Sequence, residues 1–147
     1  MKISAALLAF IMAVSALPVQ SFAESRNVDG IWLDDGERLK DVAMPQTGPL
    51  RLDGWTRRGR GEVYRIKVKA GQTVKIELAS SSEFVLMAVF DFSTPEEDAI
   101  FFSDAEGKTA VLTPKTDTDW LIRPTLILGS SRRGLGAHYT LTVSTQK

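Results

Sequence analysis

The chain has 147 residues, with 18 basic and 18 acidic side chains, one histidine and no cysteine. Balanced charge argues against a nucleic-acid-binding protein, which needs a basic excess to neutralise phosphates. The absence of cysteine excludes disulfides, thiol catalysis and thiolate metal sites, so packing alone must hold the fold together.

The first residues have the features of a secretion signal. Lys2 precedes an apolar run over residues 5–14, and Ser21 and Ala23 place small side chains at the −3 and −1 positions of a cleavage site. The run is shorter than the ~20 apolar residues that span a bilayer. We therefore expect residues 1–23 to be a signal peptide, and the mature protein to be periplasmic or secreted with no membrane span.

Residues 24–46 show little strict periodicity. We expect an extended N-terminal arm that buries Trp32 and Leu33 against the body of the protein, followed by a polar loop over the charged run 34–38. One short helical turn around Leu39 is the alternative. The remainder, residues 47–147, is expected to form a single β-domain.

Two runs within residues 61–79 alternate strictly between apolar and polar side chains. Tyr64, Ile66 and Val68 share one face of the first run, and the second run resumes the alternation from Val74. A period of two predicts strands with one buried face. Gly71, which lies between the runs, is expected to form the turn of an antiparallel hairpin.

The rest of the chain predicts further short strands separated by turn residues. The nearly continuous apolar run 84–92 predicts a central strand buried on both faces. In the run 120–128, Pro124 predicts an edge strand or a bulge because proline cannot donate to a ladder. Shorter strands are expected over 49–55, 96–102, 108–113 and 137–144. About eight strands without a long helix indicate an all-β sandwich or barrel.

Three segments together are similar to the bacterial pre-peptidase C-terminal domain family: the Tyr64–Gln72 stretch with its Ala-Gly-Gln turn, the stretch Thr116–Pro124, and the closing Tyr139–Val143 strand. The periplasmic inhibitors of goose-type lysozyme look like stand-alone members of this fold. The resemblance covers roughly residues 50–143. It implies a single jelly-roll-like antiparallel β-sandwich, and an inhibitor of lysozyme that acts through its loops.

Acidic residues gather between positions 91 and 106, and a solvated loop, a partner surface and a calcium site are all compatible with them. Under the inhibitor interpretation, opposite charge would favour docking to a cationic lysozyme. We expect two loops to form the partner-binding surface, with no cofactor and no metal. Its candidate residues are Glu96, Glu97, Asp98, Ser130, Ser131, Arg132 and Arg133.

Other candidate residues point to weaker alternatives. Arg57, Arg58 and Arg60 form a basic patch that could contact anionic envelope polymers or merely be solvated. Trp55 is the tryptophan expected to be exposed and could stack on a sugar, whereas Trp32 and Trp120 are expected in the core. His138, the only histidine, is interpreted as an ordinary strand-end residue, since neither a catalytic triad nor a histidine metal site is assembled around it.

The sequence therefore predicts an exported, non-enzymatic binding protein. Inhibition of a goose-type lysozyme is the leading function, with a protein as partner. A carbohydrate, peptidoglycan or envelope-polymer binding module is the alternative. A metal-dependent hydrolase built on the acidic residues is the least favoured class.

Overall fold

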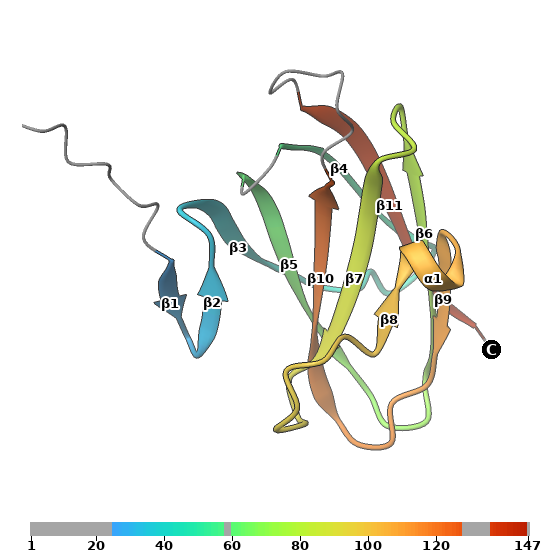
Figure 1. Cartoon of the computed structure of the whole chain (residues 1–147). Coiled ribbons are helices and arrows are strands. Elements are labelled where there is room, and N and C mark those ends of the chain that lie inside the picture. The colour runs from blue at the N-terminus through green and yellow to red at the C-terminus, as the bar shows by residue number, and fades with distance from the viewer. Residues whose placement is uncertain (1–24, 58–59, 128–135, 147) are drawn as a thin grey trace, which may run out of the picture.

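The computed structural model describes residues 25–57, 60–127 and 136–146. Two β-sheets pack face to face, and a small hairpin lies against the outside of one of them (Figure 1). The hairpin consists of β1 (Arg26–Val28) and β2 (Ile31–Leu33). The five-stranded sheet contains, in spatial order, β3 (Gly36–Val42), β5 (Arg60–Val68), β10 (Thr118–Leu126), β7 (Val85–Asp91) and β8 (Phe101–Phe102). The four-stranded sheet contains β4 (Leu50–Thr56), β11 (Ala137–Gln146), β6 (Thr73–Ser80) and β9 (Thr109–Leu112).

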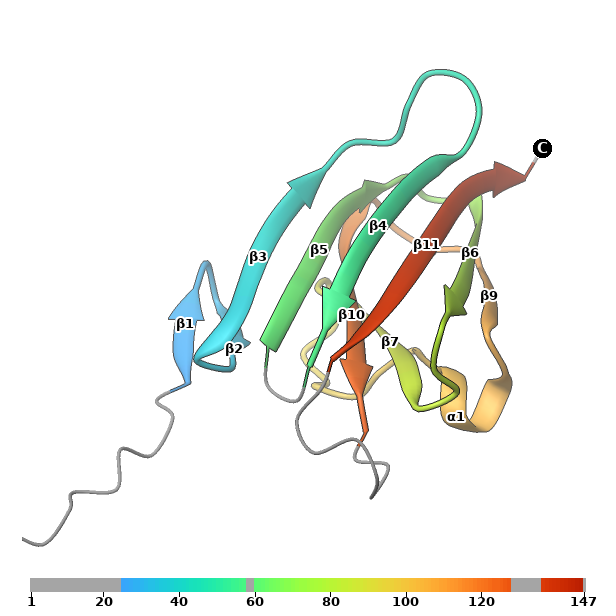
Figure 2. The same ribbon diagram turned by 90° about the horizontal axis from the view of Figure 1, so that it is seen from above.

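The two-layer arrangement confirms the predicted all-β sandwich, and Figure 2 shows the sheets as separate layers. Nearly all pairs of neighbouring strands are antiparallel; among the described strands, only β3 and β5 pair in parallel. A single helical turn, α1 (Ser103–Glu106), joins β8 to β9. Within the described part of the chain, no helix is long and apolar enough to cross a bilayer.

The core between the sheets is made by the inward side chains of alternating strands. Tyr64 and Ile66 of β5 and Val74 and Ile76 of β6 are buried there, as the alternation predicts. Trp120 is also buried in this core, which confirms its predicted position. The two-residue period therefore identified the core-facing residues of β5 and β6.

The prediction of a hairpin around Gly71 is wrong. β5 pairs with β3 and β10, whereas β6 pairs with β11 and β9, so the turn carries the chain from one sheet to the other. Gly71 has a φ of 75°, and its amide donates to Pro114 rather than across a hairpin. Strands that face each other across a core show the same alternation as strands paired in one sheet, so the period does not distinguish the two arrangements.

Three other parts of the predicted pattern differ in detail from the structure. From Gly36 onward the charged run expected to be a loop belongs to β3, as does Leu39 of the alternative helical turn, because Gly36–Val42 pairs with β5 and extends the sheet. The strand expected over 96–102 is reduced to Phe101–Phe102. β10 as a whole is an internal strand between β5 and β7, but at Pro124 it pairs with β7 alone, so the predicted edge position holds locally. Pairing with β5 ends at Ile122, so the missing N–H of Pro124 breaks no ladder bond on that side.

Candidate functional site

The hairpin β1–β2, which we call the N-terminal hairpin, exposes a tryptophan. Asp29 and Gly30 form its two-residue turn with φ values of 54° and 84°, and Asn27 accepts a hydrogen bond from the Gly30 amide. Alternation along β2 then places Ile31 and Leu33 against the protein and Trp32 in solvent, with 60% of its surface exposed. The prediction that Trp32 lies in the core is therefore wrong.

A second apolar cluster attaches the N-terminal hairpin to the outer face of the five-stranded sheet. Ile31 and Leu33 are buried there together with Val63 of β5 and Leu121 of β10. Phe90 of β7 packs against the same cluster. These strands are thus buried on both faces where the hairpin covers them.

An ion pair under the N-terminal hairpin fixes its position. Arg123 Nη2 lies 3.0 Å from the carboxylate of Glu37 and donates to the carbonyl of Trp32 at 2.6 Å. Glu37, which is only 7% exposed, also accepts a hydrogen bond from the Asp34 amide at 2.9 Å. A buried carboxylate with a charged partner and a backbone donor is well satisfied. The network therefore joins β3, β10 and the hairpin.

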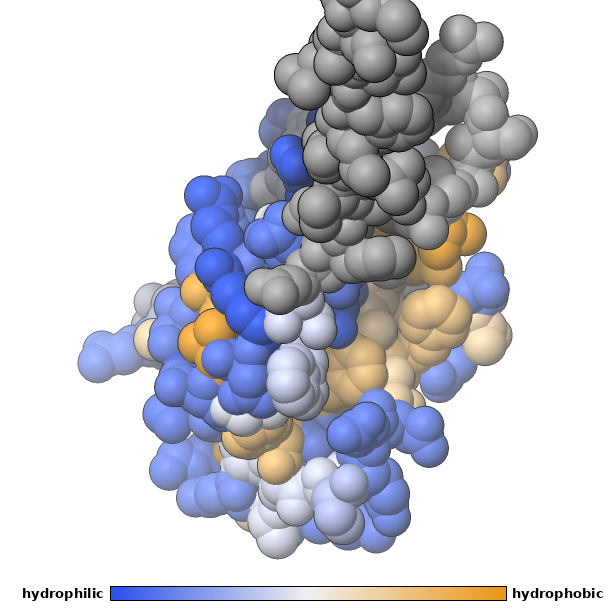
Figure 3. All heavy atoms as spheres, turned by 60° about the vertical axis from the view of Figure 1, so that its left-hand side comes forward, coloured by the Kyte–Doolittle hydropathy of each residue, from blue (hydrophilic) through white to orange (hydrophobic). Residues whose placement is uncertain are grey.

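A groove of about 270 Å³ runs between the N-terminal hairpin and the loop of residues 92–100 that connects β7 to β8. We call it the hairpin groove. Figure 3, which turns the hairpin side of the molecule forward, shows apolar residues exposed among hydrophilic ones. The aromatic walls are Trp32 and Phe92, both exposed, and the floor includes Phe90 and Leu121.

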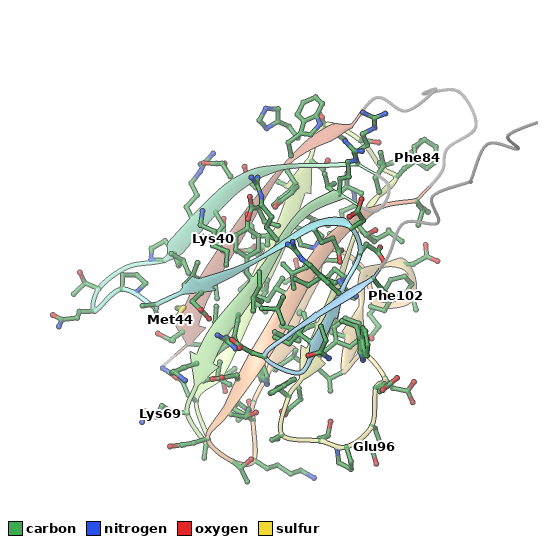
Figure 4. The ribbon with its side chains drawn as sticks, turned by 90° about the vertical axis from the view of Figure 1, so that its left-hand side faces the viewer. Lys40, Met44, Lys69, Phe84, Glu96 and Phe102 are labelled. Atoms are coloured by element: carbon green, nitrogen blue, oxygen red, sulfur yellow. The ribbon has the colours of Figure 1, made fainter. Side chains whose placement is uncertain are left out.

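The predicted acidic residues lie on one side of this groove. Glu96 and Glu97 line it, whereas Asp98 does not. All three side chains are exposed, and within the described residues none forms an ion pair. Figure 4 labels Glu96 on the loop below the hairpin. The groove is therefore apolar inside and acidic at its edge.

Asp91 adds a further negative charge where β7 ends. Burial disfavours its ionised form, but hydrogen bonds from the Ser93 amide and hydroxyl and from the Thr118 hydroxyl together outweigh burial. The pKa of Asp91 is therefore held below its ordinary value. Asp91 consequently remains ionised at neutral pH.

The other expected partner-binding residues, Ser130, Ser131, Arg132 and Arg133, lie outside the described residues. The described ends that flank their segment can be placed. Leu126, at the end of β10, pairs with Val85, whereas Asp91, just before the acidic loop, pairs with Trp120. The flanking end of β10 therefore lies at the opposite end of the sandwich from Glu96 and Glu97 (Figure 1).

The outer face of the four-stranded sheet presents the second exposed tryptophan. Trp55 is 52% exposed, which confirms the prediction for this residue. Its ring meets the His138 ring edge to face, with centroids 4.8 Å apart. Gly136 is required beside it, since a Cβ there would lie 1.9 Å from the Trp55 ring nitrogen. His138 is thus an exposed residue at the start of β11, as interpreted from the sequence, and it packs against an aromatic ring.

Arg57 and Arg60, the described residues of the predicted basic patch, are exposed, whereas two basic residues further along β5 are paired with acidic ones. Arg65 is paired with Asp41 and Asp29, and Lys67 lies 3.3 Å from Asp119. Arg58, one of the three arginines of the predicted patch, lies outside the described residues. Much of the positive charge along β5 is therefore neutralised locally.

Within the described ranges, no group of three or more histidine or acidic side chains is placed to hold a metal ion. The acidic residues between 91 and 106 are spread over the end of β7, the β7–β8 loop and α1. The calcium alternative and the metal-dependent hydrolase thus find no support there.

The sequence interpretation missed Trp32, Phe92 and Arg123 as residues of the groove. A usable signal was present, because Asp29-Gly30 between two short apolar runs is typical of a two-residue hairpin turn. Alternation from that turn would have placed Ile31 and Leu33 inward and Trp32 outward. Nothing in the sequence marks Arg123, whose partner Glu37 lies far away along the chain.

The fold belongs to a known class of small β-sandwich. No protein-family model and no curated protein matches the sequence. The pre-peptidase C-terminal domain of a collagenase from Bacillus anthracis covers 74% of this chain and 96% of its own, with a TM-score of 0.51 and 12% identity. This likeness confirms the predicted class of fold.

Solved lysozyme inhibitors share the same fold. PliG from Aeromonas hydrophila, a periplasmic inhibitor of g-type lysozyme, has a TM-score of 0.61 and 22% identity, over 75% of this chain and 99% of that protein. PliG from Salmonella Typhimurium has a TM-score of 0.54 and 14% identity, over 73% and 99% respectively. The predicted resemblance to both groups is therefore confirmed for the fold.

Proposed function

We propose that this protein is an exported, non-enzymatic inhibitor of a lysozyme, most specifically of the goose type. The observation that carries the proposal is the match to PliG structures over 99% of their own length. A fold alone does not define function. The proposal therefore also needs a surface suited to docking on a protein.

The hairpin groove provides such a surface. Interfaces concentrate their energy in a few aromatic or arginine anchors surrounded by polar groups. Trp32 and Phe92 are exposed aromatic residues on the two sides of the groove, and Glu96 and Glu97 supply a polar edge. We infer that the partner docks here, with Asp98 as an outer contact. Ser130, Ser131, Arg132 and Arg133 remain a proposed second contact.

Lysis of bacterial cell walls by a goose-type lysozyme tests the function directly. We expect the purified protein to slow lysis at micromolar concentration and to act less on a chicken-type lysozyme. Trp32→Ala should weaken inhibition about thirtyfold, the effect of removing an anchor worth ~2 kcal/mol. Trp55→Ala, which removes the other exposed tryptophan, is the matched control and should leave inhibition unchanged. Lysis at an unchanged rate with excess wild-type protein would refute the proposal.

Binding of an envelope polysaccharide is the second candidate, and Trp55 favours it. An exposed tryptophan ring beside His138 offers a flat apolar surface with a polar neighbour. Retention on purified peptidoglycan measures this activity. Loss of retention in Trp55→Ala, with retention kept in Trp32→Ala, would support the polysaccharide function. Equal retention of both variants would remove Trp55 as its binding residue.

A further inference from the structure

The hairpin groove combines an apolar interior with excess negative charge. Its floor contains Val63, Phe90 and Leu121, and its walls carry the exposed rings of Trp32 and Phe92. Pro95 lines the side of the groove that the loop of residues 92–100 forms. The interior therefore favours an alkyl chain or a flat group that can lie against aromatic rings.

The charged groups of the groove are unbalanced. Asp91, Glu96 and Glu97 line it, and Arg123 is the only basic residue that does so among those described. The charge of Arg123 is already matched by Glu37, which lies beneath the hairpin 3.0 Å away. Glu96 and Glu97 have no ion-pair partner within the described ranges. A cation entering the groove would thus meet carboxylates whose charge is not yet neutralised.

We propose that the hairpin groove receives an arginine or lysine side chain of a partner protein. Its alkyl stem lies between Trp32 and Phe92, and its charged end lies beside Glu96 and Glu97. Long basic side chains bury their stems on apolar surface while the charge stays at the edge, and aromatic rings attract cations held over their faces. The inference rests on the proposed function only for the identity of the partner, since the chemistry of the groove is independent of it.

The position of the groove walls supports a preformed site. Arg123 holds the Trp32 carbonyl at 2.6 Å, and the Phe92 amide donates to the Asp119 carbonyl at 3.0 Å. The turn of the N-terminal hairpin also meets Phe92, because a Cβ on Gly30 would lie 3.3 Å from the ring. Both walls are therefore anchored to the sheet, and little ordering is needed on binding.

Nuclear magnetic resonance titration with two capped amino acids tests the charge requirement. N-acetyl-arginine methylamide is compared with the citrulline analogue, which has nearly the same shape and no charge. With the arginine probe, the indole N–H signal of Trp32, assigned with Trp32→Phe, and the amide signal of Glu97 should shift. The shifts should shrink as salt is raised, since exposed charges are screened. The citrulline probe should give much smaller shifts.

Variants that remove a carboxylate charge supply the matched control. Glu96→Gln combined with Glu97→Gln should raise the dissociation constant of the arginine probe about fivefold, the combined effect of two exposed ion pairs. Asp104→Asn removes the same kind of charge from the exposed helical turn α1, which follows β8, and Asp104 does not line the groove. It should change the constant less than about twofold.

The outcomes separate this inference from the proposed function. Equal shifts with arginine and citrulline, or an unchanged constant in the Glu96 and Glu97 double variant, would overturn the inference even if lysozyme is inhibited. Charge-selective shifts without any inhibition of lysozyme would retain the groove as a site for basic side chains and reject the proposed partner. If the same signals shift with protein concentration when no probe is present, a second copy of the protein occupies the groove. That result would also overturn the inference.

Discussion

The outer faces of the two sheets differ in what covers them. On the five-stranded sheet, Val63 and Leu121 point outward and are buried by the N-terminal hairpin. On the four-stranded sheet, outward positions carry charged residues that pair along one strand, such as Lys75 with Glu77 at 2.8 Å. One face is thus an extension of the core and the other is a solvated surface. The hairpin that covers the first face also creates the groove at its margin.

The largest effect on stability is expected from substitutions at two adjacent residues of β10, which lie on opposite faces of the sheet. Ile122 points into the core between the sheets and is fully buried, whereas Leu121 points outward under the N-terminal hairpin. We expect Ile122→Ala to lower the free energy of unfolding by about 4 kcal/mol and Leu121→Ala by about 2 kcal/mol, because the hairpin can settle into the space. Urea unfolding measures both. Equal losses would mean that the hairpin cluster is as rigidly packed as the core.

A medium effect is expected for the ion pair beneath the N-terminal hairpin. Glu37→Gln removes the partner of Arg123 in a largely buried setting and should cost about 2 kcal/mol, less than for a fully buried pair because Arg123 is partly exposed. Hydrogen exchange of the hairpin amides should accelerate more than that of β11. The double variant Glu37→Leu with Arg123→Met should recover part of the loss, since no unpaired charge remains. Faster hydrogen exchange spread evenly over both sheets would contradict a local role of this ion pair in holding the hairpin.

A smaller effect concerns the one pair of tyrosines that joins the sheets. Tyr64 of β5 and Tyr139 of β11 are buried, with their hydroxyl oxygens 2.8 Å apart. Burial raises the pKa of both groups, so we expect neither to ionise in the folded protein at neutral pH. Tyr139→Phe leaves the Tyr64 hydroxyl unpaired and should cost about 1–2 kcal/mol. Replacing both tyrosines by phenylalanine should cost less than this single change, as thermal unfolding would show.

The sequence alone was sufficient for the class of fold and for most inward-facing residues. Alternation is imposed by the geometry of a strand, so Ile66 and Val74 could be assigned to the core without knowing their partners. Strand pairing could not be read in the same way. The hairpin predicted at Gly71 connects two sheets because facing strands and paired strands obey the same period.

The candidate site was less predictable because its parts come from distant segments. Glu96 and Glu97 were identified from local charge alone. The environment of these residues is created by Trp32 and Arg123, which pairing and the ion pair with Glu37 bring to the same side of the sheet. Such contacts depend on the tertiary arrangement. No local pattern in the sequence predicts them, because the contacting residues lie far apart along the chain.

The smallest expected change in stability is for two aspartates, one from each region, and it depends on pH. Asp91 accepts three hydrogen bonds beside the groove, whereas Asp53 lies in solvent on the four-stranded sheet, paired with Arg51 at 3.1 Å. The pKa of each is lowered, so any stabilisation is present above the ordinary aspartate pKa of about 4 and is lost as the pH falls through the folded value.

We expect Asp91→Asn to reduce stability by up to about 1 kcal/mol at pH 7 and to equal the wild type at a pH below the lowered value. Asp53→Asn should have no measurable effect at either pH, because exposed ion pairs are screened by water and salt. Thermal unfolding at pH 7 and at a series of lower pH values, down to the point where the wild type stops changing, measures both. A pH-dependent loss in Asp53→Asn as large as that in Asp91→Asn would mean that the solvated face contributes as much to the fold as the covered one.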